Sequence, residues 1–363
     1  MERLRRREGD DMQQDFTLPD RMLAMVLDAP GKPLQPRMLP LPAPAASQVL
    51  IRVGACGVCR TDLHIADGEL PSHKLPLVPG HEVAGTVVRT GAGVTRLQPG
   101  QRVGVPWLGH TCGLCAFCRM HRENLCDHAL FTGYDIDGGY AAYAMADAGY
   151  CIALPDRYDD LHAAPLLCAG LIGFRAYSMM QPQARRLGIY GFGAAAHIVA
   201  QVARHEGREV FAFTRPGDRR SQAFALSLGA SWAGDATQSP PAAIDAALIF
   251  APSGALVPAA LAHVRKGGDV ICAGIHMSDI PSFAYSLLWG ERQLRSVANL
   301  TRADGDAFFR FAAAHAIDSR VVPYPLEKAN EALDDLRSGR FDGAAVLVPG
   351  GITVAARAAA DVD

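Results

Sequence analysis

The stretch "RRLGIYGFGAAAH", residues 185–197, decides the fold of this chain. An apolar run leads into Gly191 and Gly193, and small residues that begin a helical pattern follow at once. With Ala196 in third place this is the pattern G-x-G-x-x-A, in which the backbone approaches a pyrophosphate at the beginning of a helix. A generic tight turn is the alternative for so short a pattern. The strand before it and the helix after it favour the dinucleotide site.

The same strand–helix alternation continues downstream of this stretch. Residues 194–207 predict an apolar-periodic helix that Gly207 ends, residues 208–214 predict a strand, and residues 218–230 predict a second helix. Further units follow, in the order strand, helix and strand, at 243–252, 256–268 and 269–275. Repeated units of this kind predict an α/β fold with a doubly wound parallel sheet, a Rossmann nucleotide domain over residues 169–298.

The rest of the chain has a different pattern. From about residue 22 to 155, short β-branched runs alternate with Gly and Pro, as in 48–58, 81–91 and 138–146, which predicts a β-rich domain. Residues 299–350 carry two helical patterns and a final strand, and we assign them to this second domain together with residues 21–168. Residues 1–20 lack an apolar core and are predicted to be a disordered extension.

Composition limits the classes of function. The 363 residues are 49% hydrophobic and 20% charged, with a formal net charge of −2. This predicts a large packed core and gives no basic excess for binding nucleic acid or an anionic membrane. No apolar run is long enough to span a bilayer, and the N-terminus does not resemble a secretory signal. We therefore expect a cytoplasmic protein whose partners are small molecules, not nucleic acid or membrane.

Four of the nine cysteines lie close together in one polar stretch. They are Cys112, Cys115, Cys118 and Cys126, spaced C-x2-C-x2-C-x7-C. Four thiolates on short loops can close a tetrahedron around a structural zinc ion. An iron–sulfur cluster is the alternative for a tetrathiolate site, and unligated buried thiols are the less specific one. We predict a structural zinc.

Two further cysteines lie in "ACGVCRTDLH", residues 55–64. Cys56 and Cys59 could form a redox pair, but such a pair normally opens a helix, whereas this stretch predicts a strand entering a turn. "PGHEVAG", residues 79–85, adds His81 and Glu82, and Cys168 follows in an apolar run. Taken singly, His81 could be an ordinary hydrogen-bonded side chain and Cys168 a core residue.

The strand after the glycine turn bears on the choice of cofactor. A Rossmann domain that binds NAD normally ends this strand with an acidic residue for the ribose hydroxyls. Here Thr214 takes that place and Arg215 follows. A carboxylate would repel a 2′-phosphate, whereas Thr and Arg would accept it, so NADP is favoured over NAD. The alternatives are that Asp218 reaches the ribose and that Arg215 is a solvated turn residue.

Taken together, these motifs resemble a known family. "GVCRTDLH", "PGHEVAG", the four-cysteine segment, "LLCAG" and "GFGAAAH" occur in the order seen in zinc-dependent medium-chain alcohol dehydrogenases, over nearly all of residues 22–350. The yeast and bacterial tetrameric branch is the most similar. The resemblance implies a GroES-like catalytic domain beside the Rossmann domain, two zinc ions per chain and a homodimer or homotetramer.

The implied activity is interconversion of an alcohol and an aldehyde or ketone by hydride transfer to or from NAD(P). A zinc-free quinone reductase of the same superfold is the nearest alternative, and a non-enzymatic zinc-scaffold protein is another. The simultaneous presence of Cys59, His81 and Cys168 disfavours a zinc-free quinone reductase. The dinucleotide loop disfavours a non-enzymatic zinc-scaffold protein.

The resemblance also assigns roles to single residues. It places Cys59, His81 and Cys168 on the catalytic zinc, with Glu82 behind the metal and able to exchange onto it. Asp62 would hold the free ring nitrogen of His81 and so fix its orientation and basicity.

The resemblance further implies a proton relay and two binding surfaces. Thr61 would take the proton of the alcohol and pass it through the cofactor ribose to His64, although a surface histidine is the alternative for His64. Trp107 and Tyr134 would line the substrate pocket, while Ile172 stands where the family usually has Thr. The cofactor would be bound by Arg60 at the pyrophosphate and by Gly191, Gly193, Ala194, Ala196, Thr214, Arg215, Gly274 and Ile275.

Overall fold

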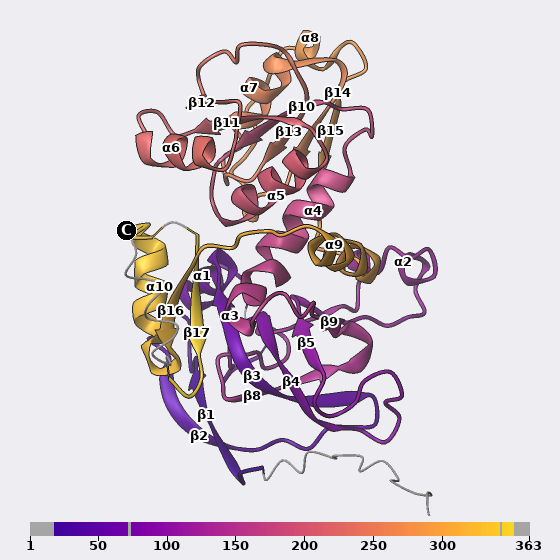
Figure 1. The fold of residues 1–363 in the computed structure, drawn as a ribbon, viewed down its shortest axis with the longest axis vertical. Helices are drawn as coiled ribbons and strands as arrows, with labels where there is room; N and C mark the ends of the chain where they lie inside the picture. The colour runs from indigo at the N-terminus through magenta and orange to yellow at the C-terminus, as the bar shows by residue number, and fades with distance from the viewer. Residues whose placement is uncertain (1–17, 72–73, 342, 352–363) are drawn as a thin grey trace, which may run out of the picture.

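The computed structural model describes residues 18–71, 74–341 and 343–351, which form two large sheets (Figure 1). The six-stranded sheet lies in the upper half of Figure 1 and the seven-stranded sheet in the lower half. Helix α4 (Ala169–Ser178) runs between them. The predicted N-terminal extension lies outside the described residues, apart from residues 18–20.

The six-stranded sheet is parallel throughout, in the order β12-β11-β10-β13-β14-β15. Its strands are β10 (Arg186–Tyr190), β11 (Glu209–Thr214), β12 (Trp232–Asp235), β13 (Ile244–Ile249), β14 (Val264–Cys272) and β15 (Gln293–Ser296). The strand order reverses between β10 and β13, which is the order of a doubly wound Rossmann sheet. The predicted fold class is confirmed.

Helices cover both faces of this sheet because its strands are apolar on both sides. In β10, Leu187 and Ile189 belong to the core under α4, α5 and α6, while Tyr190 belongs to the core under α7 and α8. The helices are α5 (Ala194–His205), α6 (Arg219–Ser227), α7 (Leu256–His263) and α8 (Tyr285–Leu288).

Two of the predicted elements have different bounds in the structure. The helix predicted over 256–268 is wrong in its second half, because Val264 pairs with Ile244 and begins strand β14. The strand predicted over 138–146 begins only at Tyr143. The N–H groups of residues 138–140 instead donate to carbonyl oxygens of residues 78–80, which fixes that segment as a loop.

The seven-stranded sheet joins both ends of the chain, in the order β16-β17-β3-β4-β5-β9, with β8 also paired to β3. Its strands are β3 (Gln48–Val58), β4 (Glu82–Thr90), β5 (Arg102–Val105), β8 (Tyr143–Asp147), β9 (Ile152–Ala153), β16 (Val321–Pro325) and β17 (Ala344–Val348). Strand β17 runs antiparallel to β3, with Leu347 opposite Cys56. The C-terminal segment thus completes the N-terminal sheet. The exact domain boundaries stay a prediction.

Smaller elements surround this sheet. They are the strand pairs β1 (Arg21–Val26) with β2 (Gln35–Pro40) and β6 (Leu108–His110) with β7 (Leu130–Phe131), and the helices α1 (Arg60–Asp67), α2 (Ala116–Arg119), α3 (Asp160–Ala163), α9 (Arg302–Ala314) and α10 (Ala329–Ser338). Among the residues with a described structure, no helix combines the length and apolarity needed to cross a membrane.

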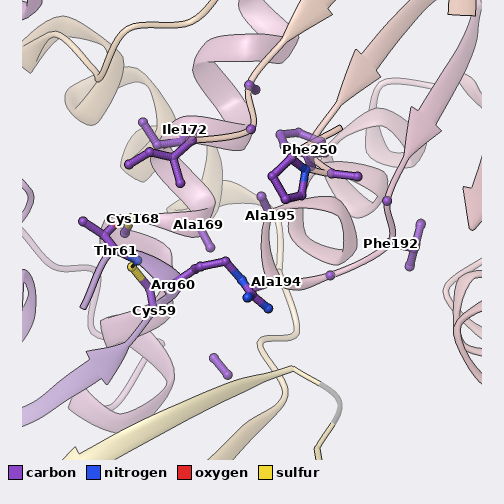
Figure 2. A pocket seen from close by; sticks show the side chains of 18 of the residues that line it. Cys59, Arg60, Thr61, Cys168, Ala169, Ile172, Phe192, Ala194, Ala195 and Phe250 are labelled. Carbon is purple, nitrogen blue, oxygen red and sulfur yellow. Dashed lines mark hydrogen bonds between the residues drawn. The ribbon is translucent and has the colours of Figure 1, made fainter. Parts of the chain in front are cut away.

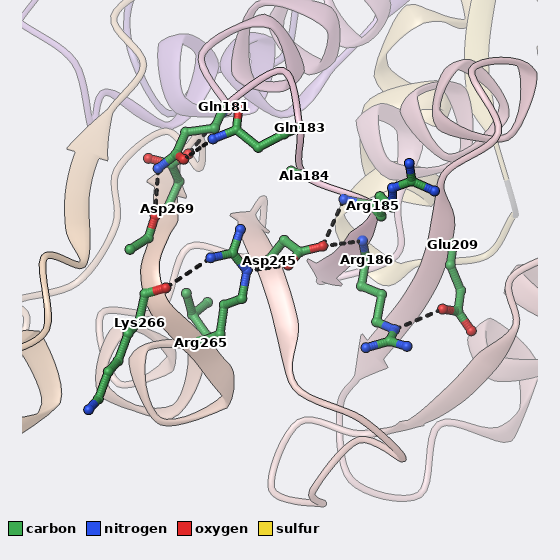
Figure 3. A network of polar contacts seen from close by, with 12 residues as sticks. Gln181, Gln183, Ala184, Arg185, Arg186, Glu209, Asp245, Arg265, Lys266 and Asp269 are labelled. Carbon is green, nitrogen blue, oxygen red and sulfur yellow. Dashed lines mark hydrogen bonds and ion pairs between the residues drawn. The ribbon is translucent and has the colours of Figure 1, made fainter.

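A polar network closes the amino-terminal edge of the parallel sheet (Figure 3). The Asp245 carboxylate accepts hydrogen bonds from the backbone N–H groups of Arg185 at 2.7 Å and Arg186 at 2.8 Å, and from the Arg265 side chain. The Arg186 side chain in turn pairs with Glu209 at 3.1 Å. These contacts tie the beginnings of β10, β11, β13 and β14 together and leave the opposite, carboxyl edge free for a ligand.

Candidate active site

A cavity of about 1180 Å³ lies between the two sheets and is lined by residues of both (Figure 2). Loops after the carboxyl ends of β10, β11, β13 and β14 form one side of it. Residues of α1, the beginning of β4 and the beginning of α4 form the other side. This is the place where open α/β sheets bind ligands, at the point where the strand order reverses.

The predicted catalytic ligands converge on the second side of the cavity. The ligand atoms of Cys59, His81, Glu82 and Cys168 all lie within 4.8 Å of one another. The Cys59 sulfur is 3.0 Å from His81 Nε2. Two thiols, an imidazole nitrogen and a carboxylate oxygen are donors that zinc accepts, so the group fits a zinc ion.

Helix α1 positions Cys59, and the sequence did not predict this helix. The Cys59 thiol caps it by accepting a hydrogen bond from Thr61 N–H at 3.3 Å, and the Asp62 carboxylate accepts one from Cys59 N–H at 2.9 Å. The predicted strand is confirmed as β3, which ends at Val58, but the turn expected after it is the first turn of α1. Cys56 is a fully buried free thiol of β3 packed in the sheet's core, and Cys59 is also unbridged, so the two form no disulfide here.

The two thiols of the cluster differ in acidity. Burial raises the pKa of Cys59, but the hydrogen bond from Cys168 and the nearby His81 outweigh it and hold that pKa well below its ordinary value. The same hydrogen bond, with burial, raises the pKa of Cys168. Cys59 is thus the readier thiolate, and thiolate is the form that binds a metal.

Carboxylates lie behind the cluster. Asp62 Oδ1 is 3.3 Å from His81 Nδ1, and both side chains are 1% exposed. His81 therefore faces Cys59 with one ring nitrogen and a buried carboxylate with the other. The Glu82 carboxylate occupies space beside Gly57, where an added Cβ would be 1.8 Å from its oxygen. Only glycine at position 57 leaves room for this carboxylate beside the cluster.

The four cysteines of the second predicted metal site also converge, in a segment around α2 that we call the cysteine lobe, residues 111–128. The sulfur of Cys112 is 4.0 Å from that of Cys118 and 3.5 Å from that of Cys126. Two sulfur ligands of one tetrahedral zinc ion lie ~3.8 Å apart, which is between these two values. Backbone N–H groups of Leu114 and Cys115 lower the pKa of Cys112 to about 6. The convergence of the four sulfur atoms and the readily ionised Cys112 fit a zinc ion.

The dinucleotide loop forms the first side of the cavity. Helix α5 begins at Ala194, and no side chain caps its N-terminus, which leaves its first N–H groups available to an anion. Figure 2 shows Arg60 extending from beside Cys59 toward Ala194. A positive side chain and an uncapped helix N-terminus therefore face the same space, which fits a pyrophosphate.

Most of the predicted cofactor residues line the cavity. Those that do are Arg60, Gly191, Gly193, Ala194, Thr214, Arg215, Gly274 and Ile275. Ala196 does not line it. Its side chain is fully buried in the core beneath the sheet, where a larger residue would separate α5 from the strands.

Beyond β11 the cavity has a basic rim that the sequence revealed only in part. Thr214 is buried, and its hydroxyl accepts a hydrogen bond from Gln222 Nε2 at 3.1 Å. Asp218 caps α6 by accepting from Ser221 N–H at 3.0 Å. Arg220 and Ser221 line the cavity beside Arg215. The sequence could have indicated Arg220 and Ser221, because both lie in the first turn of the helix that follows β11.

The substrate end of the cavity contains one of the two predicted aromatic residues. Trp107 lines the cavity and makes an edge contact with His81, the ring centroids being 4.9 Å apart. Tyr134 does not line it, and that prediction is wrong. Tyr134 stacks behind Trp107 at 5.7 Å, and its hydroxyl donates to Pro71 O. Ile172 and Phe250 line the cavity as well, and Phe250 was not predicted.

The two predicted relay residues lie on one face of α1. Thr61 is buried and lines the cavity. His64, one turn further along, does not line it, and its Nδ1 is hydrogen-bonded to the carboxylate of Glu69. Its relay role remains a prediction.

Comparison with known proteins bears on this site. The alcohol dehydrogenase GroES-like domain matches residues 45–156. A protein of Mycobacterium tuberculosis named "Probable alcohol dehydrogenase AdhA" is 48% identical over 323 residues, which cover 87% of this chain and 93% of that protein. The chain belongs to the zinc-dependent medium-chain alcohol dehydrogenase family.

Two further similarities support this assignment to the family. An alcohol dehydrogenase of Geobacillus stearothermophilus is 36% identical over 337 residues, covering 90% of this chain and 99% of that enzyme. The solved structure of acetophenone reductase from Geotrichum candidum in complex with NAD is 26% identical, with a TM-score of 0.81, and the match covers 92% of this chain and 98% of that one. The predicted GroES-like domain and the predicted oxidoreductase are confirmed: the chain is an enzyme that interconverts alcohols and carbonyl compounds with NAD(P).

Proposed function

We propose that this alcohol dehydrogenase works with a zinc ion bound by Cys59, His81 and Cys168 and that it prefers NADP(H) to NAD(H). The observation that carries the proposal is the convergence of these ligand atoms on one side of the cavity, opposite the uncapped N-terminus of α5. When bound, the metal supplies a Lewis acid for the substrate oxygen and the nicotinamide supplies the hydride acceptor or donor.

The chain's own residues orient the reactants and move the proton. Asp62 fixes the ring of His81 through Nδ1, while Glu82 lies close enough to act as a fourth ligand. Thr61 lines the cavity next to Cys59, and its hydroxyl takes the proton that the alcohol loses. His64 lies three residues further along α1 on the same face and receives this proton.

The pocket shape and the basic rim suit particular ligands. Trp107 occupies the space beside His81 and narrows the substrate end, which favours slender alcohols and aldehydes. At the other end, Arg215, Asp218 and Arg220 all line the cavity, so two positive charges accompany one carboxylate, which also caps α6. A 2′-phosphate finds charge-assisted partners there, which supports the preference for NADP.

We further propose a second, structural zinc ion in the cysteine lobe and a homodimer or homotetramer formed through the nucleotide sheets. Strand β15 lies at the end of the six-stranded sheet and, among the described strands, pairs only with β14. Tyr285 and Trp289, 68% and 64% exposed, lie just before it in the chain. Large exposed aromatic side chains beside an open sheet edge are typical of an interface.

The decisive experiment combines metal analysis with kinetics. The purified enzyme should contain two zinc ions per chain, lose one in Cys168→Ser and lose the other in Cys112→Ser. A panel of primary, secondary and aromatic alcohols, run with each cofactor, should give the higher kcat/KM with NADP. A single zinc per chain contradicts the metal assignment, and a clear preference for NAD contradicts the cofactor assignment.

A further inference from the structure

His64 is held between two side chains that the family resemblance did not assign. Its Nδ1 is hydrogen-bonded to the Glu69 carboxylate, and its ring packs against the ring of His276, with centroids 4.8 Å apart and planes inclined by 47°. The side chain of His64 is only 13% exposed, whereas that of Glu69 is 56% exposed. Glu69 therefore connects a nearly buried imidazole to solvent.

The end of helix α1 places Glu69 beside His64. Gly68 follows the helix in the left-handed conformation, with φ of 77°. The chain reverses there, and Glu69 N–H donates to His64 O at 2.9 Å. This closing of the last helical turn fixes the backbone of Glu69 over His64. The local structure thus brings the backbone of Glu69 next to His64, where its carboxylate reaches Nδ1.

His276 reaches His64 from the other domain. It follows Gly274 and Ile275, which line the cavity, and its backbone is left-handed, with φ of 51°. A non-glycine residue rarely adopts this conformation, and it is maintained where the surroundings require it. The contact between His276 and His64 therefore links the loop after β14 to α1 on the opposite side of the cavity.

We propose that Glu69 and His276 are positioning residues of the proton relay: Glu69 fixes the tautomer of His64 and receives its proton, and His276 holds the imidazole in place. The inference rests on the proposed relay through Thr61 and His64. With Nδ1–H donating to a carboxylate, Nε2 is the ring's acceptor nitrogen. Nε2 is buried and has no hydrogen-bond partner among the described residues, so it is available to accept a proton.

The proton balance of this route is complete. In alcohol oxidation the hydroxyl proton leaves by way of Thr61 and is taken up at His64 Nε2, while the hydride is transferred to the oxidised cofactor, which becomes reduced. The Nδ1 proton then moves to the Glu69 carboxylate and from there to water, which leaves neutral His64 with its proton on Nε2. Exchange with solvent protons returns the ring to the Nδ1–H tautomer before the next turnover. The titratable and charged groups around Glu69 are His64, His276 and Arg60. The hydrogen bond with His64 lowers the pKa of the Glu69 carboxyl, which keeps it ionised and able to accept a proton.

Glu69→Gln tests the proposal. The amide keeps the size of the side chain but cannot accept a proton, so kcat for alcohol oxidation near neutral pH should fall about threefold to tenfold, a part of a typical acid–base contribution. An increasing concentration of imidazole buffer should restore turnover, because it replaces the lost acceptor. The pH–kcat profile should also change shape, because the route through the Glu69 carboxylate is gone.

The matched control is Asp67→Asn, which removes the exposed carboxylate at the last residue of α1, one that pairs with Arg337. It should leave kcat, the pH profile and buffer dependence unchanged. His276→Ala should lower kcat with the same rescue by imidazole, while His276→Phe, which keeps an aromatic ring against His64, should stay near wild type. Zinc content and Tm are measured for each variant to confirm that it is folded.

The outcomes separate this inference from the relay on which it rests. If His64→Gln lowers kcat and Glu69→Gln does not, the route through Glu69 is wrong and the relay stands. If His64→Gln itself leaves the pH profile unchanged, the relay fails and the present inference fails with it. Equal losses in His276→Ala and His276→Phe contradict a role for ring packing.

Discussion

The side-chain amide of Asn124 donates a hydrogen bond of 2.7 Å to the carbonyl oxygen of Ala298, 174 residues further along the chain. Asn124 belongs to the cysteine lobe and is 7% exposed. Ala298 belongs to the segment 297–300, which lines the cavity after the last strand of the nucleotide sheet. The neighbouring Glu123 carboxylate accepts from Arg302 N–H at 2.9 Å. The lobe is thus fastened to one wall of the cofactor cavity.

Asn124→Ala should weaken cofactor binding without removing a ligand of either metal. Loss of a buried hydrogen bond costs about 1 kcal/mol, so we expect a cofactor Kd about twofold to fivefold higher and a small decrease in Tm. Fluorescence titration with the reduced cofactor measures the first and thermal unfolding the second. The control is Asn330→Ala, because Asn330 makes two hydrogen bonds of 2.9 Å with Leu34, and neither residue lines the cavity. A similar change of Kd in both variants would mean that only general stability had changed.

Asp62→Asn should weaken metal binding at the catalytic cluster. The amide is nearly isosteric and can still accept from Cys59 N–H, but it no longer presents a negative charge to His81 Nδ1. Loss of such an outer partner typically reduces metal affinity about 10- to 100-fold. Competition with a chelator, followed by zinc analysis, should show early loss of one zinc ion and unchanged retention of the other. Simultaneous loss of both ions contradicts the prediction.

Asp245 should make folding sensitive to acid. Burial raises the pKa of this carboxyl, but the hydrogen bonds from Arg186 N–H and from the Arg265 side chain outweigh it and lower the pKa below its ordinary value. Because the pKa is lower in the folded state, the stabilisation is present above the unfolded pKa of about 4 and is lost as pH falls through the folded value. Asp245→Asn should therefore cost about 1 kcal/mol at pH 7 and progressively less below pH ~4. Urea unfolding of both proteins across this range measures the difference, and a pH-independent difference would contradict it.

Periodicity and glycine placement were sufficient to predict the nucleotide sheet. Its strands are buried on both faces, and the helices between them end at glycines such as Gly207. Helix α1 escaped prediction because its capping box uses Cys59 and Asp62 in place of the usual Ser or Thr and Glu or Gln. The end of α7 escaped it because pairing of Val264 with Ile244, a tertiary contact, overrides the local helical pattern.

Only the site residues that belong to recognisable sequence motifs could be predicted. Four of the five ordered motifs contain all eight candidate metal ligands, and the structure brings these ligands together in two groups. Tyr134 was misplaced because no pattern tells which of two stacked aromatic rings faces the cavity. Glu69 had a local signal in Gly68, the helix-ending glycine before it. No sequence signal indicated Asn124, because its partner Ala298 lies in a distant segment that comes close only in the folded chain.

Arg215→Ala should shift the cofactor preference. Arg215 lines the cavity at the rim beyond β11, and loss of one charged hydrogen bond to a 2′-phosphate costs about 1.5–3 kcal/mol. We expect KM for NADPH to rise about 10- to 100-fold while KM for NADH hardly changes, since NADH has no phosphate at this position. Arg220→Ala should act in the same direction. The control is Arg219→Ala, since Arg219 is exposed on the same helix and does not line the cavity. Equal increases in both KM values would show that Arg215 contacts a part common to the two cofactors, and the preference for NADP would then lose its support.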